Sequence, residues 1–333
     1  MTLNRNSGFT LVEMIVAMAI LGIVVAGAMQ TFVVQNHSYT VVDETTEAQQ
    51  NLRAISYLLE RDLRVTSFML PEGAAACGID NANAADTLYV TDSEPINPAG
   101  LSSAGLYATI ASGYTVGGSL ETLVVDKVTL DGQAYFDNDA DGTLDSDFRD
   151  KGGAIVFDPT NPSRGTACGI VESVPDGTHV RVAFESHLRV GGGTLAVVPA
   201  IVYAVDANGK LLRNGVILAN DVDDLQVAYF IDTDADGVVD ANEYRGDGVS
   251  ADYLSGGTTP LPTDHSKLRE IRFNVVVRSR TEDPTYAADG YVQSTENRGA
   301  VGGNDGFRRR VFSSTVRQRN VGYRGVQPHV AGG

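Results

Sequence analysis

The feature that most constrains this chain is an apolar run of 21 residues from Phe9 to Met29, which contains one charge, Glu13. A bilayer core of about 30 Å is crossed by a helix of about 20 apolar residues. The run therefore predicts a membrane-spanning helix. A cleaved secretory signal peptide or a simple uncleaved anchor are the alternatives, but the run is long, contains Glu13 and lacks an A-x-A-like cleavage site after it.

The charges on either side of the run predict its orientation. Arg5 precedes it, whereas Asp43, Glu44 and Glu47 follow it. Positive residues stay on the cytoplasmic side of a membrane. We therefore expect Met1 in the cytoplasm and the bulk of the chain outside.

The junction before the apolar run carries a motif, Gly8-Phe9-Thr10-Leu11-Val12-Glu13. It resembles the processing site of type IV prepilins. The resemblance implies that a prepilin peptidase removes the leader 1–8 by cutting between Gly8 and Phe9, that Phe9 is then N-methylated, and that Glu13 assists assembly.

The position of Glu13 has a physical rationale under this reading. A carboxylate in lipid is costly and usually marks function. Cleavage would create a positive amine at Phe9, and Glu13 of a neighbouring subunit could pair with it, because attraction is strong at low dielectric. The alternative is a carboxylate that snorkels to the nearby interface.

The helical pattern continues past the membrane run. No proline occurs from Phe9 to Leu70, and Pro71 and Gly73 then end the pattern. One helical stripe is formed by Leu52, Ile55, Leu59 and Leu63. We expect a helix of about 60 residues, about 90 Å long, with a transmembrane and assembly part at 9–34 and an amphipathic part at 35–70.

The remainder, 71–333, is expected to be a β-rich domain. Short β-branched runs alternate with turn residues, and Asp206–Gly209 forms a hairpin turn. Segments 92–119 and 281–306 are expected to be loops. The expected strands are Thr87–Thr91, Thr122–Leu130, Ala154–Phe157, His179–Phe184, Ile201–Val205, Lys210–Arg213, Leu225–Ile231, Glu270–Arg278 and Arg309–Arg317.

The predicted fold class is α+β. One long N-terminal helix packs on a single antiparallel β-sheet domain with long loops. This is the lollipop shape that the resemblance to type IV pilins implies.

Two acidic loops have the spacing of calcium ligands, and each follows an Ala-Tyr-Phe triplet. Calcium takes 6–8 oxygen ligands, and residues 1, 3, 5, 7, 9 and 12 of a tight loop supply them around a glycine at position 6. In the second loop these ligands are Asp232, Asp234, Asp236, the Val238 carbonyl, Asp240 and Glu243.

The first loop is less complete. Its ligands would be Asp137, Asp139, Asp141, the Thr143 carbonyl and Asp145, but Phe148 stands at position 12. Asp147 or Asp150 could substitute there. The alternative for both loops is a solvated acidic turn; with calcium bound, we expect one or two structural sites.

Cys77 and Cys168 are the two cysteines, and both lie outside the membrane in this topology. An oxidising compartment favours a disulfide between them. Two separate thiols or an intermolecular link remain the alternatives, because sequence does not show whether the sulfurs meet.

The C-terminal stretch Phe307–Asn320 is similar to the closing strand of PilW-type minor pilins. Similar pieces are Leu59–Arg64, Val205–Arg213 and Asp224–Asp240. Alternating Arg309, Val311, Ser313, Thr315 and Arg317 form either the solvent face of a strand or a docking surface for an acidic partner.

The resemblance implies a non-catalytic role in pilus biogenesis. Such a protein primes filament assembly in the inner membrane and ends at the pilus tip, on the cell surface. Its partners are other minor pilins and the major pilin, through the N-terminal helix, together with the prepilin peptidase and the inner-membrane assembly platform.

Two alternatives remain, a minor pseudopilin of a type II secretion system and a calcium-dependent tip adhesin. Enzymatic motifs such as a P-loop, HExxH or GxSxG are absent from the sequence. Lys and Arg number 25 against 42 Asp and Glu, and this net charge of −17 argues against nucleic-acid binding.

Overall fold

The structure is a computed structural model of the chain. It describes residues 9–66, 76–81, 83–92, 107–112, 114, 119–130, 146–161, 164–186, 188, 193–232, 234, 236, 244–245, 267–283, 286, 295–296, 298–299 and 305–318. By internal contacts the chain divides into two units, 1–47 and 48–333.

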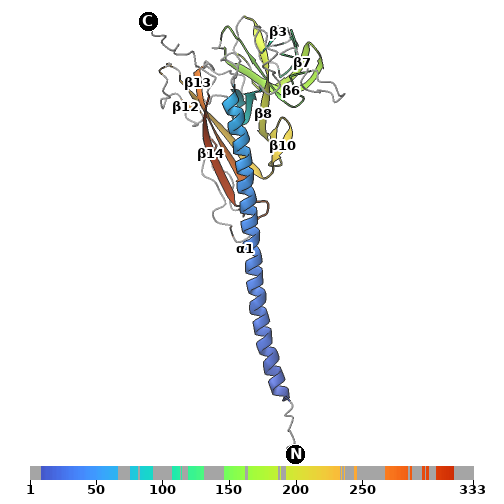
Figure 1. The fold of residues 1–333 in the computed structure, drawn as a ribbon, viewed down its shortest axis with the longest axis vertical. Helices are drawn as coiled ribbons and strands as arrows, with labels where there is room; N and C mark the ends of the chain where they lie inside the picture. Colours follow the sequence, from blue (N-terminus) through green and yellow to red (C-terminus); the bar gives the residue numbers. More distant parts are fainter. Residues whose placement is uncertain are drawn as a thin grey trace, which may run out of the picture. The chain divides into compact units, whose positions relative to one another are not determined.

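Helix α1 is a single element of 55 residues, Leu11–Val65, drawn as the long blue helix in Figure 1. It ends at Val65, short of the expected Leu70. Thr66 follows as a buried turn residue, and its hydroxyl donates to the Asp62 carbonyl at 3.0 Å. This bond satisfies one of the carbonyls that a helix end leaves open.

The first unit is the exposed part of α1. Its apolar side chains face outward on all sides, and α1 is long and apolar enough to cross a membrane. Five hydroxyls along it donate to a carbonyl four residues earlier, namely those of Thr31, Ser38, Thr40, Thr45 and Thr46. Each bond pairs a hydroxyl within the helix itself. Thr31 is the one of the five that lies in the expected transmembrane part, where such internal pairing suits an apolar solvent.

The second unit contains two antiparallel sheets among its described residues, in agreement with the expected antiparallel β-sheet domain. The larger has ten strands: β1 (Ala76–Ile79), β2 (Thr87–Thr91), β3 (Ala108–Ser112), β4 (Leu120–Val125), β5 (Gly153–Phe157), β6 (Thr166–Asp176), β7 (His179–Phe184), β8 (Leu195–Val205), β9 (Leu211–Arg213) and β10 (Val216–Ala219). The smaller has the order β12 (Tyr244–Arg245), β11 (Val222–Ile231), β13 (Leu268–Arg278) and β14 (Arg309–Arg317).

Six strands of the larger sheet close into a ring. The order β8-β3-β4-β7-β6-β5 returns to β8, because β5 pairs with residues 196–200 of β8. The second half of β8 leaves this ring and pairs with β2 and β9 instead. The length of β8 therefore lets one strand serve both the closed barrel and the open extension.

The second unit has two hydrophobic cores. The first core fills the barrel with residues such as Leu123, Phe157 and Val182. The second lies between the last part of α1, the barrel extension and the four-stranded sheet. Its helical contribution is the predicted stripe, Leu52, Ile55, Leu59 and Leu63, which is buried.

The expected strands are found, with changes at their ends. Those at 87–91, 179–184 and 309–317 match β2, β7 and β14 to the residue. The run 122–130 is shorter than expected, since β4 ends at Val125. The expected loop 92–119 is wrong in its described part, because Ala108–Ser112 forms β3 and pairs with both β4 and β8.

Four further strands, β1, β6, β10 and β12, were not anticipated. The hairpin turn at Asp206–Gly209 is present. Asp206 N–H donates to the Lys210 carbonyl at 2.9 Å, and Gly209 has a φ of +71°. That left-handed conformation is readily adopted by glycine.

Candidate functional site

The start of α1 is organised by a capping box between Thr10 and Glu13. One Glu13 oxygen, Oε2, accepts from the Thr10 N–H and from the Thr10 hydroxyl, both at 2.9 Å. The Glu13 N–H donates to the Thr10 hydroxyl at 3.3 Å in return. A Thr-x-x-Glu pair of this kind satisfies helix N–H groups that otherwise lack partners.

The capping box gives Glu13 a structural role that the sequence reasoning did not foresee. The carboxylate lies one turn into an exposed apolar helix, and it is tied down by the residue that follows Phe9. Gly8, the other residue of the expected cleavage site, lies outside the described residues.

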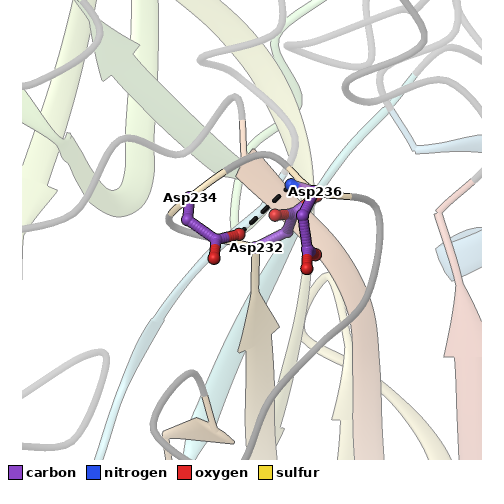
Figure 2. Close-up of side chains that lie close together, drawn as sticks. All are labelled: Asp232, Asp234 and Asp236. Atoms are coloured by element: carbon purple, nitrogen blue, oxygen red, sulfur yellow. Dashed lines mark hydrogen bonds between the residues drawn. The ribbon is translucent and has the colours of Figure 1, made fainter.

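Three aspartates come together where β11 ends. Asp232 follows the last residue of β11, and its N–H donates to the Lys267 carbonyl beside β13 at 3.0 Å. Carboxylate oxygens of Asp232, Asp234 and Asp236 all lie within 4.8 Å of one another, as Figure 2 shows. The Asp236 N–H donates to Asp234 Oδ1 at 3.1 Å, which tightens the turn.

The chemistry of this cluster fits a hard cation. Asp232 is fully buried, whereas Asp234 and Asp236 are exposed. Arg269 from β13 donates to Asp232 Oδ2 at 3.0 Å, so one cation already offsets part of the charge. Three carboxylates still carry more negative charge than one guanidinium, and oxygen ligands of this kind suit calcium.

The other expected calcium ligands fall outside the described residues. These are Val238, Asp240 and Glu243 of the second loop and, in the first loop, Asp137, Asp139, Asp141, Thr143 and Asp145. The described part of the chain therefore contains one such acidic cluster. Of the substitutes considered for the first loop, Asp147 is buried, and its Oδ2 accepts from the Leu130 N–H at 2.5 Å.

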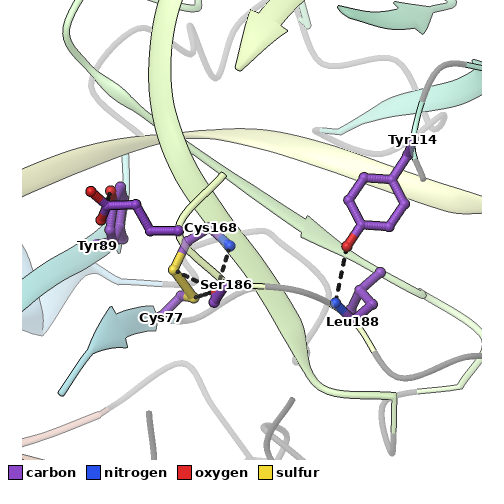
Figure 3. Close-up of a disulfide and its surroundings, with 7 residues drawn as sticks. Cys77, Tyr89, Tyr114, Cys168, Ser186 and Leu188 are labelled. Carbon is purple, nitrogen blue, oxygen red and sulfur yellow. Dashed lines mark hydrogen bonds between the residues drawn. A yellow bond between two sulfur atoms is a disulfide. The ribbon is translucent and has the colours of Figure 1, made fainter. Parts of the chain in front are cut away.

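The two cysteines meet in the structure. Cys77 of β1 and Cys168 of β6 form a disulfide across 91 residues of sequence, with 6.1 Å between their Cα atoms. Both are buried, and the Ser186 hydroxyl lies 3.2 Å from Cys168 Sγ (Figure 3). The bond links β1, outside the barrel, to a barrel strand.

A buried charged network was missed by sequence reasoning. Asp62 on α1 accepts from the Tyr203 hydroxyl at 2.7 Å and from Arg213 Nε at 2.9 Å, and Arg61 Nε donates to its other oxygen at 2.9 Å. The signal was present in Leu59–Arg64, where the charged Asp62 falls three residues after Leu59 and so on the side of the leucine stripe. Its partners, 141 and 151 residues away, had no local signal.

The alternation along β14 agrees with a solvent face at four of five positions. Val311, Ser313, Thr315 and Arg317 are exposed. Arg309 is the exception, because its side chain is 4% exposed and bonded to Asp223 at 2.6 Å and to Asp305. That arginine anchors the beginning of the strand and does not belong to a surface.

Two family models match the chain. Residues 189–320 match the type IV pilus-assembly protein W family, PilW, and residues 3–29 match the prokaryotic N-terminal methylation motif. This is a PilW-like chain. The PilW match covers less than half of the sequence and contains β8–β14 with the acidic cluster, while the methylation motif contains Gly8, Phe9 and Glu13.

The fold of the PilW-like chain agrees with the class expected from the sequence, one long apolar helix followed by antiparallel sheets. A search of curated proteins found no match. Among solved structures, a type IV-like pilin from Thermus thermophilus is similar over 51% of this chain and 85% of that pilin, with 17% sequence identity and a TM-score of 0.24.

Proposed function

We propose that this PilW-like chain is a minor pilin that primes type IV pilus assembly in the inner membrane and is carried to the pilus tip. The observation that carries the proposal is the pairing of two matches on one chain, a methylation motif at its start and a PilW region at its end. The role is structural, and partner subunits and the assembly platform supply the work.

The N-terminus supplies the assembly element in this proposal. A prepilin peptidase cuts between Gly8 and Phe9, Phe9 is methylated, and Glu13 pairs with the Phe9 amine of a neighbouring subunit. Thr10 already holds Glu13 Oε2, so the carboxylate is oriented before a neighbour arrives. The N-terminus lies in the cytoplasm and the second unit lies outside.

The acidic cluster is the proposed calcium site. Asp232, Asp234 and Asp236 would hold calcium, and this would fix the turn that follows β11. A cation that binds only the folded chain stabilises it by about 2.7 kcal/mol at a concentration 100 times its dissociation constant. The role would be to hold a loop of the second unit in place.

The test of the proposed function is a clean deletion of the gene, scored for surface pili and for secreted enzymes in the same cultures. Loss of pili with normal secretion supports the minor-pilin role. Normal pili with blocked secretion would identify a type II secretion pseudopilin instead. Normal pilus number with lost adhesion would favour a tip adhesin.

Calcium binding has a separate test on the full chain in detergent. We expect the melting temperature to fall when a chelator removes calcium and to recover when calcium is restored. Asp234→Asn and Asp236→Asn should abolish this response, because each removes an exposed carboxylate of the cluster.

Glu172→Gln is the matched control for calcium binding, since it removes a charge from an exposed pair with Arg181 on the barrel. It should keep the full calcium response. If the melting temperature of the unaltered chain is the same with and without calcium, the proposed site is refuted.

A further inference from the structure

The solvent face of α1 in the second unit is a basic stripe with one aromatic residue. It consists of Gln50, Arg53, Tyr57, Arg61 and Arg64, spaced by three or four residues, so that all five lie on one side of the helix. All are exposed, and Tyr57 is 70% exposed. The opposite side carries the buried leucine stripe.

The stripe is positive in a chain whose net charge is −17. Two carboxylates occur between residues 48 and 65, Glu60 and Asp62, and neither is exposed. Glu60 accepts from Arg64 and from Ser314 of β14, both at 2.7 Å. Asp62 is shared between Arg61 and Arg213, two cations for one buried anion. The face that solvent meets is therefore cationic.

The composition of the stripe is that of an interaction surface. Tyrosine and arginine are enriched among the residues that dominate binding energies, and an isolated exposed tyrosine between arginines offers apolar area beside charge. At the Arg61 end a cavity of about 230 Å³ opens, lined by Asp62, Thr91, Asp92 and Arg213 among others. Such a hollow can receive a partner side chain.

We propose that this stripe docks an acidic surface of a neighbouring, different pilus subunit. The inference rests on the proposed function, which places such subunits beside the helix. Charge complementarity selects the partner, because an acidic face gains attraction along the whole row of arginines. Within a complex of different pilins, the subunit beside this helix is another pilin.

Anionic lipid is the less suitable occupant. Arg53, the first arginine of the stripe, lies 19 residues after Val34, the last residue of the expected transmembrane part. A helix of that length rises about 28 Å, whereas surface charges are screened beyond about 8 Å at physiological salt. The arginines would have to act far beyond the reach of the headgroups.

The test uses the full chain, expressed in the deletion strain, with a benzophenone amino acid in place of Tyr57. Light should crosslink it to a pilus subunit of acidic character, identified by mass spectrometry. In that background Arg53→Glu should lower the crosslink yield about tenfold, the effect of roughly 1.4 kcal/mol, and Arg53→Lys should retain it.

Arg181→Glu is the matched control, because it makes the same charge change at an exposed position of β7 on the barrel. It should leave the crosslink unchanged. Arg53 and Arg181 are both on the surface, so neither variant is expected to unfold the chain, and an intact disulfide on a non-reducing gel verifies this.

Several outcomes would overturn the docking proposal. These are a crosslink only to lipid, a crosslink to a second copy of the chain, no crosslink, or a subunit crosslink that Arg53→Glu leaves unchanged. The proposed function is tested separately, by whether the unaltered gene restores pili to the deletion strain. Failure of the docking proposal is therefore distinguishable from failure of the proposed function. A charge reversal in the captured subunit that rescues Arg53→Glu would confirm the pairing.

Discussion

Asp86 shows how one residue joins the two sheets. It lies before β2, and its Oδ1 accepts from the Asn81 N–H at 2.9 Å. Its Oδ2 accepts from the Val227 N–H of β11 at 2.8 Å, and its own N–H donates to the Leu225 carbonyl at 2.8 Å. The side chain thus replaces a strand partner at the edge of β11.

The cost of burying this carboxylate predicts a pH dependence. Burial, opposed by the two backbone donors and reinforced by Asp80 and Asp224, raises the pKa of Asp86 to about 8. The folded chain then binds a proton that the unfolded chain, with a pKa near 3.9, releases. The contribution of Asp86 to stability is therefore greatest at low pH and falls as the pH rises from about 4 to 8.

We expect the urea midpoint of the full chain in detergent to be lower at pH 8 than at pH 5. One titrating group changes the free energy of unfolding by at most about 1.4 kcal/mol per pH unit. Asp86→Asn should flatten this slope, although it also loses one backbone bond. A slope that is unchanged in Asp86→Asn would show that other groups, such as the buried Asp224, cause it.

At the scale of elements, strand β1 is held in place by one strand partner and one disulfide. It is a four-residue edge strand paired only with β2 among the described strands, and its other tie is the disulfide to β6. A crosslink that closes a loop of this length restricts the unfolded chain, worth about 4–5 kcal/mol in the chain-entropy model. The disulfide therefore stabilises an edge strand whose hydrogen bonds to β2 alone would hold it weakly.

We expect reduction of the disulfide to lower the melting temperature of the full chain. The double variant Cys77→Ala with Cys168→Ala should melt at a similarly reduced temperature and should no longer respond to reductant. Ser186→Ala keeps both cysteines and should still respond. A melting temperature that reductant does not change in the unaltered chain would contradict a stabilising bond.

The helix and the two sheets of the second unit share the second of its two cores. Leu59 and Leu63 of α1 belong to the same cluster as Tyr203 of the larger sheet and Phe273 of the smaller one. The smaller sheet completes its core with residues from the larger sheet and from the helix. Strand β8 joins this shared core to the barrel core, because Ile201 belongs to the shared core and Val202 to the barrel core. Neither is expected to remain folded when the other opens.

We therefore predict one cooperative unfolding transition for both sheets. Amide exchange in β7 of the barrel and in β13 should report the same free energy of opening. Leu59→Ala should lower both equally, by about 2–5 kcal/mol, whereas the exposed Val216→Ala should change neither by more than about 0.5 kcal/mol. Separate free energies for the two strands would show independent units.

The sequence predicted features that depend on neighbours along the chain. The apolar run is recognisable by its length, the leucine stripe of α1 by its helical period, and the strands β2, β7 and β14 by their β-branched residues. The hairpin at Asp206 has its own turn residues. The aspartate cluster was also readable, because Asp232, Asp234 and Asp236 belong to one short loop.

Tertiary structure decided what depends on distant partners. Closure of the barrel through β8, the burial of Arg309, the Asp62 network and the edge pairing of Asp86 all join residues far apart in sequence. β3 was missed because only Thr109 and Ile110 of its five residues favour a strand, and its pairing with β4 and β8 is not visible in the sequence. Local patterns determine which segments form elements; packing alone determines which elements meet, because burial and pairing energies exist only once both partners are present.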